Sequence, residues 1–286
     1  HLAHRRQRQM CIRDSIRPAK NYVNVKSLSK NMDLVIVREN TEGFYSDRNM
    51  YDGNGEFSPI PGVGLSLRKI TKEASLKIAK SAFEIAKSRS VNKSIKSKVH
   101  VVHKANVMKI TDGIFLDACR HISSKYNDVD YDEMLVDACA AHLVRKPDQF
   151  DVIVTTNMFG DILSDLATEL SGSLGLAGSL NAGSNHAMAQ AQHGAAPNIA
   201  DKNIANPISL ILSSAMLLDW LGKNREIDKL ILASNLINDS VLELLKDREV
   251  NKDAPKEKEN IMSKEEQSTP SPLSNVTKVH PIEGKK

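Results

Sequence analysis

Residues 151–167 read DVIVTTNMFGDILSDLA, and this stretch decides the fold. Its first six residues are mostly β-branched, as in a buried strand, and apolar residues at helical spacing follow Gly160. A strand that leads directly into a helix places the helix start at the carboxyl edge of a sheet. Open α/β proteins keep their ligands there. The stretch therefore predicts a strand, a helix and a ligand site at their junction.

Two aspartates of this predicted helix, Asp161 and Asp165, are four residues apart, so both carboxylates point from one helix face. Apolar residues on the opposite face require a core; they are Ile162, Leu163, Leu166, Ala167 and Leu170. A cation between the two like charges would relieve their repulsion, and oxygen-only ligation suits Mg²⁺ or Mn²⁺. The alternatives are a solvated helix face or, for Asp161, a favourable charge at a helix start.

Strand-like and helix-like segments alternate along the chain, which predicts an α/β protein. Asp-Gly and Asn-Gly pairs within residues 52–55 predict a hairpin over residues 48–68. Pro207 predicts a helix entry, and this helix should stop near Gly222. The other expected strands cover residues 33–38, 98–103, 134–137 and 151–156, and the other expected helices cover residues 71–89 and 112–126.

Composition excludes several classes of protein. The 286 residues are 41% hydrophobic and 26% charged, as in a soluble globular protein. The sequence contains no run of about 18 or more apolar residues, so we expect no transmembrane helix. A net charge of +4 with 4% aromatic residues and no zinc-finger spacing argues against nucleic-acid binding. Three cysteines without a C-x-x-C pair indicate a reducing compartment, so we expect a cytoplasmic protein.

Both ends of the chain differ from the middle. Residues 1–15 show no apolar periodicity, and we interpret them as a non-native leader. Residues 251–286 are rich in Lys, Glu, Ser and Pro without an aromatic residue, which predicts a disordered tail with a short helix near residues 261–267.

Several segments together resemble one family. Residues 37–45 read VRENTEGFY, residues 102–109 read VHKANVMK, and residues 157–165 read NMFGDILSD. HGAAP at residues 193–197 and IANP at residues 204–207 follow in the same order. From residue 16 to about residue 222 the chain is similar to the metal-dependent β-decarboxylating dehydrogenases, the isocitrate and isopropylmalate dehydrogenase family.

The resemblance implies a two-domain isopropylmalate-dehydrogenase-like α/β fold. Residues 16–170 would form the substrate, metal and dimerisation domain, and residues 171–250 part of the cofactor-binding domain. The leading strand and Gly-rich turn of that domain, and the stretch that closes it, are expected to be missing, so that this chain could be inactive alone. The hairpin region would clasp a second subunit, as in relatives.

The resemblance also assigns roles to single residues. Arg17 and Arg38 would bind substrate carboxylates, and Tyr45 would reprotonate the enol. Lys104 would assist deprotonation, and Asp137 would be a catalytic residue and the third metal ligand beside Asp161 and Asp165. Lys104 and Asp137 would act in the partner's site, so that a homodimer shares its active sites. Without the motifs, Arg38 would be interpreted as part of a surface salt bridge, Tyr45 as a packed side chain and Lys104 as an exposed lysine at a strand end.

A GxGxxG fingerprint is absent, so the nucleotide site rests on the resemblance alone. It implies cofactor binding by His193, Gly194, Ala195, Ala196, Pro197, Asn198, Ile199 and Asn206. NAD-using relatives commonly carry Asp where this chain has Asn198, which loses the repulsion of a 2′-phosphate. Ile199 resembles the NAD form, so we expect NAD, with NADP as the alternative. Gln190 departs from a Glu that relatives often carry near the nicotinamide.

The resulting functional prediction is oxidative decarboxylation of a 2-hydroxy acid, with isocitrate as first choice. The Arg-Glu-Asn-Thr-Glu-Gly segment is closer to isocitrate, homoisocitrate and tartrate members, and 3-isopropylmalate is the second choice. Two other hypotheses stay open. One is a non-catalytic regulatory-type subunit of the same family, and the other is a basic protein that binds nucleic acid or a membrane surface through its ends.

Overall fold

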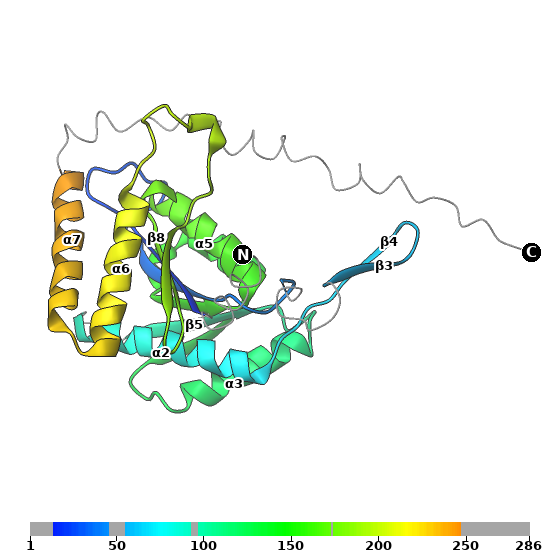
Figure 1. Ribbon diagram of the computed structural model, residues 1–286. Helices are drawn as coiled ribbons and strands as arrows, with labels where there is room; N and C mark the ends of the chain where they lie inside the picture. Colours follow the sequence, from blue (N-terminus) through cyan, green and yellow to red (C-terminus); the bar gives the residue numbers. More distant parts are fainter. Residues whose placement is uncertain (1–13, 46–54, 93–96, 173, 247–286) are drawn as a thin grey trace, which may run out of the picture.

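A seven-stranded mixed sheet organises the computed structural model, which describes residues 14–45, 55–92, 97–172 and 174–246 (Figure 1). Its strand order is β6-β5-β7-β2-β1-β8-β9. One half is parallel and consists of β6 (Asp130–Leu135), β5 (Lys98–His103), β7 (Val152–Thr155) and β2 (Asp33–Glu39). The antiparallel half adds β1 (Asp14–Lys20), β8 (Gly178–Ala182) and β9 (Ala187–Ala191). The predicted α/β fold is therefore confirmed.

The strands predicted near residues 33, 98 and 151 are confirmed, whereas the strand predicted over residues 134–137 is wrong at its end. β6 stops at Leu135, and α4 (Val136–Arg145) begins at the next residue, so Asp137 lies in the first turn of a helix. A carboxylate is favourable there because it faces the positive end of the helix dipole. Asp14 and Ser15, which the sequence assigns to the leader, begin β1.

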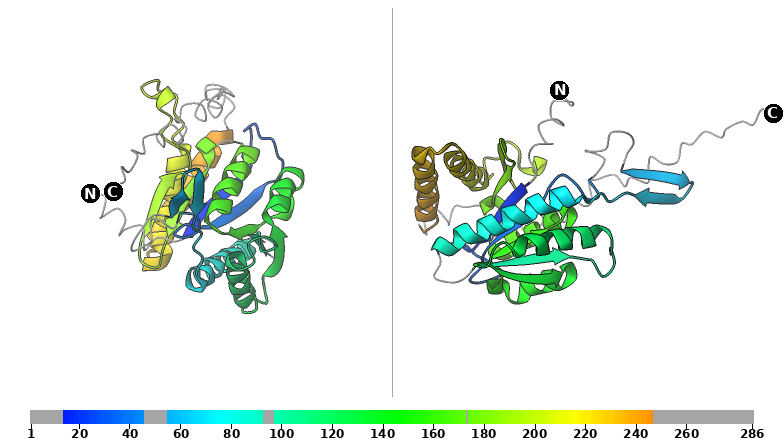
Figure 2. Two further views of the ribbon diagram at one scale, coloured as in Figure 1. Left: turned by 90° about the vertical axis from the view of Figure 1, so that its right-hand side faces the viewer. Right: turned by 90° about the horizontal axis from the view of Figure 1, so that it is seen from below.

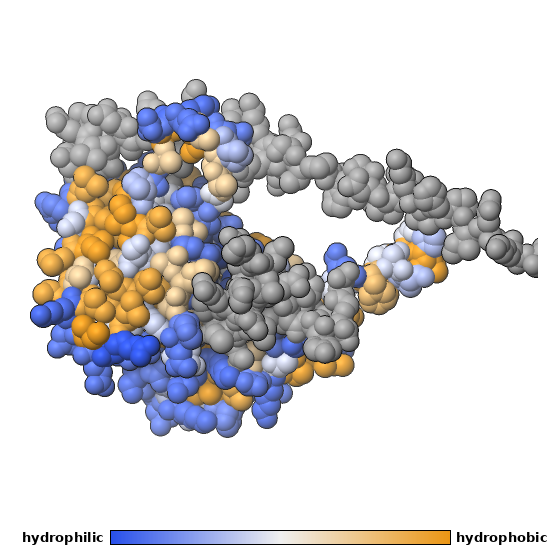
Figure 3. Space-filling view, in the orientation of Figure 1, coloured by the Kyte–Doolittle hydropathy of each residue, from blue (hydrophilic) through white to orange (hydrophobic). Residues whose placement is uncertain are grey.

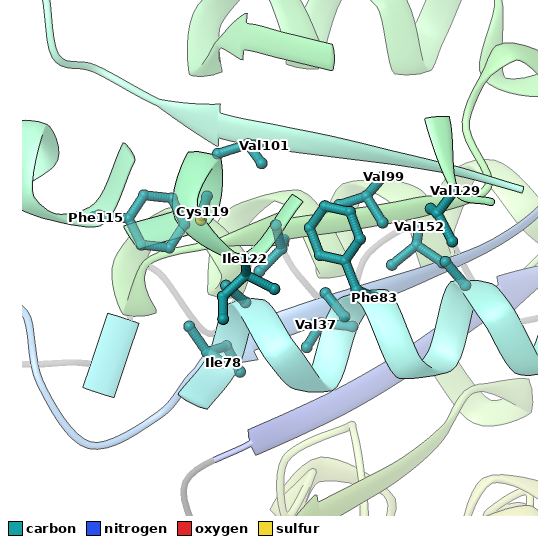
Figure 4. Packing of buried hydrophobic residues seen from close by; sticks show 14 of the residues in the cluster. Val37, Ile78, Phe83, Val99, Val101, Phe115, Cys119, Ile122, Val129 and Val152 are labelled. Carbon is teal, nitrogen blue, oxygen red and sulfur yellow. The ribbon is translucent and has the colours of Figure 1, made fainter. Parts of the chain in front are cut away.

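Successive residues of the strands face opposite layers of helices. Val35 and Val37 pack against α2 (Lys72–Asn92) and α3 (Thr111–Ser123), as Figure 4 shows for Val37. Leu34 and Ile36 instead pack toward α4 and α5 (Asn157–Ser171). The first core gathers around Phe83, Phe115, Val99, Val101 and Val152. The sheet is thus buried on both faces, which explains the continuous apolar runs of its parallel strands.

Two long helices, α6 (Ile208–Arg225) and α7 (Asp228–Lys246), pack against each other beside β8 and β9 (Figure 1). The predicted stop near Gly222 is wrong, because α6 continues to Arg225 and ends at Glu226, whose φ is +55°. Gly222 serves packing instead: a Cβ there would lie 2.6 Å from Ile231 Cγ1 of α7. The sequence analysis did not predict α4, α7, β1, β8 or β9.

The predicted hairpin exists with a different turn. β3 (Glu56–Ile60) and β4 (Val63–Ser66) join through Pro61 and Gly62, whose φ of +82° suits the third position of a type II turn. Residues 52–54 of the predicted turn lie outside the described residues. The hairpin projects from the body (Figures 1 and 2) and exposes apolar side chains such as Phe57 and Leu65.

The remaining described elements are three short 3₁₀ segments, Pro147–Gln149, Leu174–Leu176 and Pro197–Ile199. The sheet continues across residue 170, because β1 pairs with β8, so the division into two domains stays a prediction. Hydrophobic surface covers the α6–α7 side (Figure 3). Even so, none of the described helices combines the length and apolarity of a membrane span. Cys119 and Cys139 are buried free thiols, and Cys11 lies outside the described residues.

Candidate active site

The two predicted metal carboxylates lie on one face of α5. Leu163, Ala167 and Leu170 are buried on the other face, while the side chains of Asp161 and Asp165 are 39% and 48% exposed. Ile162, which we expected in the core, is 59% exposed because it lies at the edge of the apolar stripe. Two accessible carboxylates one turn apart offer only oxygen atoms. This donor set fits part of the coordination shell of a hard divalent cation.

Two buried arginines converge on Asp161 from neighbouring strands. Arg17 of β1 and Arg38 of β2 lie on the sheet face that α5 covers. Arg38 Nη1 pairs with Asp161 Oδ1, and Arg17 Nη1 lies 3.2 Å from the same oxygen and 3.7 Å from Asp165 Oδ1. Burial, followed by repulsion from Arg17, lowers the pKa of Arg38. Two desolvated cations side by side form a site for an anion with more than one carboxylate.

Asn157 and Ser164 orient these arginines, and the sequence analysis assigned a role to neither. Asn157 Oδ1 accepts hydrogen bonds from Arg38 Nε at 2.9 Å and Nη2 at 2.6 Å, and Ser164 Oγ accepts one from Arg17 Nη1 at 2.6 Å. Asn157 was detectable as a polar residue directly after a buried strand. Ser164 carried no signal, because a serine in mid-helix is usually solvated.

Gly160 permits the close approach of Arg38 to α5. A Cβ at this position would lie 2.6 Å from both Cβ and Cγ of Arg38. The glycine that marks the strand-to-helix junction in the sequence is therefore needed to make space for the Arg38 side chain.

Tyr45 completes the group around Asp161. Its hydroxyl lies 3.4 Å from Asp161 Oδ2, and the Arg38 guanidinium carbon is 5.9 Å from its ring centre. The preceding turn is closed by Glu39, whose carboxylate accepts hydrogen bonds from the Thr41 and Glu42 amides. Burial raises the pKa of Glu39. The Arg-Glu-Asn-Thr-Glu-Gly segment thus supplies both the arginine and the turn that presents the tyrosine.

Lys104 and Asp137 meet each other rather than Asp161. Lys104 Nζ lies 2.5 Å from Asp137 Oδ1 at the carboxyl ends of β5 and β6, and the Asp137 side chain is 65% exposed. The hydrogen bond from Lys104 lowers the pKa of Asp137. Within the described residues no three His, Cys, Asp or Glu side chains are close enough to hold a metal ion. One chain therefore presents two carboxylates, and the supply of Asp137 by a second copy stays a prediction.

The predicted cofactor segment follows β9 as an exposed loop. His193, Gly194, Ala195, Pro197 and Asn198 are exposed, Ala196 and Ile199 are half-buried, and a Cβ on Gly194 would meet no atom within 4 Å. The backbone is therefore open to close approach by a planar ligand. Asn206 Oδ1 accepts the Ile208 amide at the start of α6 at 3.0 Å, which leaves the Asn206 amide nitrogen for a ligand.

Two glutamines flank this loop differently. Gln190 of β9 is exposed, and its carbonyl accepts a hydrogen bond from Ser213. Gln192 Nε2 donates to Asp165 Oδ1 at 3.2 Å and to Thr168 Oγ1 at 3.1 Å. Gln192 was not predicted, and it links the loop after β9 to Asp165 of α5.

Comparison with known proteins gives a consistent result. Residues 5–268 match the model of the isocitrate/isopropylmalate dehydrogenase family. The chain is 45% identical over 232 residues to the 3-isopropylmalate dehydrogenase of Saccharolobus solfataricus, which covers 81% of this chain and 65% of the relative. It is 42% identical over 217 residues to the mitochondrial NAD isocitrate dehydrogenase catalytic subunit 5 of Arabidopsis thaliana, which covers 76% of this chain and 55% of the relative.

A solved structure agrees. The isocitrate dehydrogenase of Methylococcus capsulatus superposes with a TM-score of 0.71 at 39% identity, covering 82% of this chain and 65% of that one. The chain thus spans less than two thirds of the length of these relatives.

Proposed function

Because the chain belongs to the isocitrate/isopropylmalate dehydrogenase family, we propose that it carries out metal- and NAD(P)-dependent oxidative decarboxylation of a 2-hydroxy acid. The observation that carries the proposal is the convergence of Arg17 and Arg38 on Asp161, one helical turn from Asp165. A substrate with several carboxylates and a divalent cation match these two pairs of opposite charges.

Arg17 and Arg38 bind the substrate in this proposal. Without substrate their guanidinium groups pair with Asp161, so both positive charges are held in place by a carboxylate. A substrate carboxylate replaces this partner, and Asn157 and Ser164 keep the arginines oriented during the exchange. Burial strengthens the pairing with a substrate carboxylate, since a desolvated cation gains more from a paired anion than an exposed one.

Asp161 and Asp165 hold the metal together with Asp137 from a second copy of the chain. The bound ion, Mg²⁺ or Mn²⁺, would supply polarisation of the oxygen on C2, so that the neighbouring carboxylate can leave as CO₂.

Proton transfer is assigned to Lys104 and Tyr45. Lys104 of a second copy takes the hydroxyl proton, and NAD⁺, when bound, would supply the acceptor for the hydride on C2. The carbon–carbon bond to the leaving carboxylate breaks as CO₂ departs, and Tyr45 then gives a proton to the enol carbon. One proton is removed and one is returned, so the products are a 2-oxo acid, CO₂ and NADH. The position of the Tyr45 hydroxyl, 3.4 Å from Asp161 Oδ2, supports this assignment.

NAD is the proposed cofactor, held by the loop from His193 to Asn206. Asn198 can hydrogen-bond ribose hydroxyls, as an Asp would, but lacks the charge that repels a 2′-phosphate. Isocitrate stays our first choice of substrate and 3-isopropylmalate the second, and the relatives are named for both acids. The cytoplasmic location stays a prediction.

NADH or NADPH formation tests the proposal, measured by absorbance with Mn²⁺ and isocitrate, homoisocitrate, isopropylmalate, tartrate or malate. We expect turnover on one acid that disappears when a chelator is added. Asp165→Asn and Lys104→Met should each abolish turnover. Asp219→Asn on α6, where Asp219 pairs with Lys223 far from the site, should not.

Mixing the two inactive variants tests the shared site. A mixed dimer keeps one intact site if Lys104 and Asp165 come from different copies, so activity should return to about a quarter of the wild-type value after random exchange. No recovery would contradict the shared site. No turnover by the wild-type chain on any acid would contradict the catalytic proposal and favour a non-catalytic subunit.

A further inference from the structure

Arg68 lies almost fully inside the protein, two residues after β4, at the end of the segment predicted as a hairpin. Its side chain is 8% exposed. Nη1 donates to Thr111 Oγ1 at 2.6 Å, and Nη2 donates to Thr156 Oγ1 at 3.0 Å. The guanidinium carbon also lies 5.9 Å and 5.8 Å from the ring centres of Phe44 and Phe159. A planar cation between two aromatic rings and two hydroxyls has little freedom to move.

Asp112 is the counter-ion of Arg68 and is fully buried. Arg68 Nη1 lies 2.5 Å from Asp112 Oδ1, and the Asp112 side chain is 0% exposed. The second oxygen, Oδ2, accepts a hydrogen bond from the backbone amide of Lys104 at 2.5 Å. Asp112 also lies in the first turn of α3. Its negative charge is favourable there and offsets the charge of Arg68, which lies near the positive N-terminal ends of α3 and α5.

The partners of this pair are sequence neighbours of the proposed reacting groups. Phe44 precedes Tyr45, Thr156 and Phe159 begin the helix that carries Asp161, and the bound amide belongs to Lys104 itself. The pairing of β7 with β2 and β5 already brings these three segments to one edge of the sheet. The Arg68–Asp112 pair adds side-chain contacts that link the loop after β5 to the other two segments beyond the ends of the strands.

We propose that Arg68 and Asp112 are positioning residues that fix the Lys104 loop relative to the Tyr45 turn and the start of α5. The proposal rests on the proposed function, because it assigns Lys104 to proton transfer. It implies that the two halves of the site, one used by the chain itself and one offered to a second copy, are set by one buried ion pair.

Arg68→Lys tests the proposal, with Arg89→Lys as its matched control. Arg89 is also a largely buried arginine paired with two aspartates. Asp33 begins β2 and Asp151 directly precedes β7, so both lie at the opposite ends of the parallel strands. Lysine keeps the charge at both positions and loses the fork of donors. Both variants should therefore lose stability. Only Arg68→Lys should change the amide exchange and the amine reactivity of Lys104.

Two readouts need no catalysis. Amide hydrogen exchange should be faster at Lys104 in Arg68→Lys than in Arg89→Lys. In competitive acylation, Arg68→Lys should change the reactivity of the Lys104 amine relative to that of Lys98, and Arg89→Lys should not. Lys98 begins β5, the strand that Lys104 follows, and pairs with Asp132. If turnover is observed, kcat should fall roughly 10²-fold while KM for substrate changes much less, since misplacement of a reacting group affects the chemical step.

Asp112→Asn provides a rescue test, because it keeps an acceptor for the Lys104 amide that Asp112→Ala removes. Exchange at Lys104 should therefore be slower in Asp112→Asn than in Asp112→Ala. If these variants do not fold, Thr111→Val offers a milder change, because it removes one hydrogen bond of Arg68. It should also make amide hydrogen exchange at Lys104 faster. Equal Lys104 exchange and labelling in Arg68→Lys and Arg89→Lys would overturn the proposal. A wild-type chain without turnover would reject the proposed function and leave these two readouts decisive.

Discussion

At the scale of single residues, Gly160 decides whether Arg38 can reach its place. A Cβ at residue 160 would overlap the Arg38 side chain, whereas one at Gly113 of α3 would meet nothing within 4 Å. We expect Gly160→Ala to lower the free energy of unfolding by about 1–3 kcal/mol through overpacking. Gly113→Ala should raise it by about 0.5–1 kcal/mol through the entropy of the unfolded chain. Urea denaturation of both variants measures this, and equal effects would show that Arg38 moves aside at no cost.

At the scale of elements, Gln192 joins the loop after β9 to α5 through two hydrogen bonds, one of them to a charged group. Gln192→Leu keeps most of the side-chain volume but loses both hydrogen bonds to α5. In this variant the proposed cofactor would have to order the loop when it binds, which costs binding free energy. We expect NADH to bind roughly tenfold more weakly, which titration calorimetry measures. Gln149→Leu removes a glutamine that donates only to a backbone carbonyl near α4, and it serves as the control. Unchanged NADH affinity in Gln192→Leu would show that the link between this loop and α5 does not contribute to NADH binding.

At the scale of the whole molecule, His100 in the middle of β5 makes stability depend on pH. Burial lowers the pKa of His100 to about 4 from its ordinary value of 6.5, and Lys98 adds to the effect. Between pH 6.5 and 4, His100 is therefore protonated in the unfolded chain but neutral in the folded chain. Stability is fully present above pH 6.5 and falls by about 3 kcal/mol as the pH drops toward 4. Urea midpoints across this range should lose that slope in His100→Leu and keep it in His121→Gln, which alters an exposed histidine of α3. A slope that persists in His100→Leu would assign it to other groups, such as His103, whose pKa burial also lowers.

The sequence by itself determined the local parts of this protein. The α/β alternation, the β5 strand and the strand-to-helix junction at Gly160 follow from side-chain period and from turn chemistry within a few residues. The family also follows from short motifs, because they are contiguous in the sequence, as at residues 38–45 and 157–165. The i, i+4 spacing placed Asp161 and Asp165 on one face without any knowledge of the sheet.

Only the tertiary structure decided what depends on contacts between distant segments. The antiparallel pairings of β1 with β2 and β8 bring Arg17 beside Arg38, and no local pattern predicts that register. The Gly222 error has the same origin, since a glycine needed for helix packing is locally indistinguishable from one that ends a helix. Arg68, Asp112 and Gln192 carry no local signal at all. Their roles arise because burial removes water and leaves each polar group dependent on partners that the chain brings from 8 to 88 residues away.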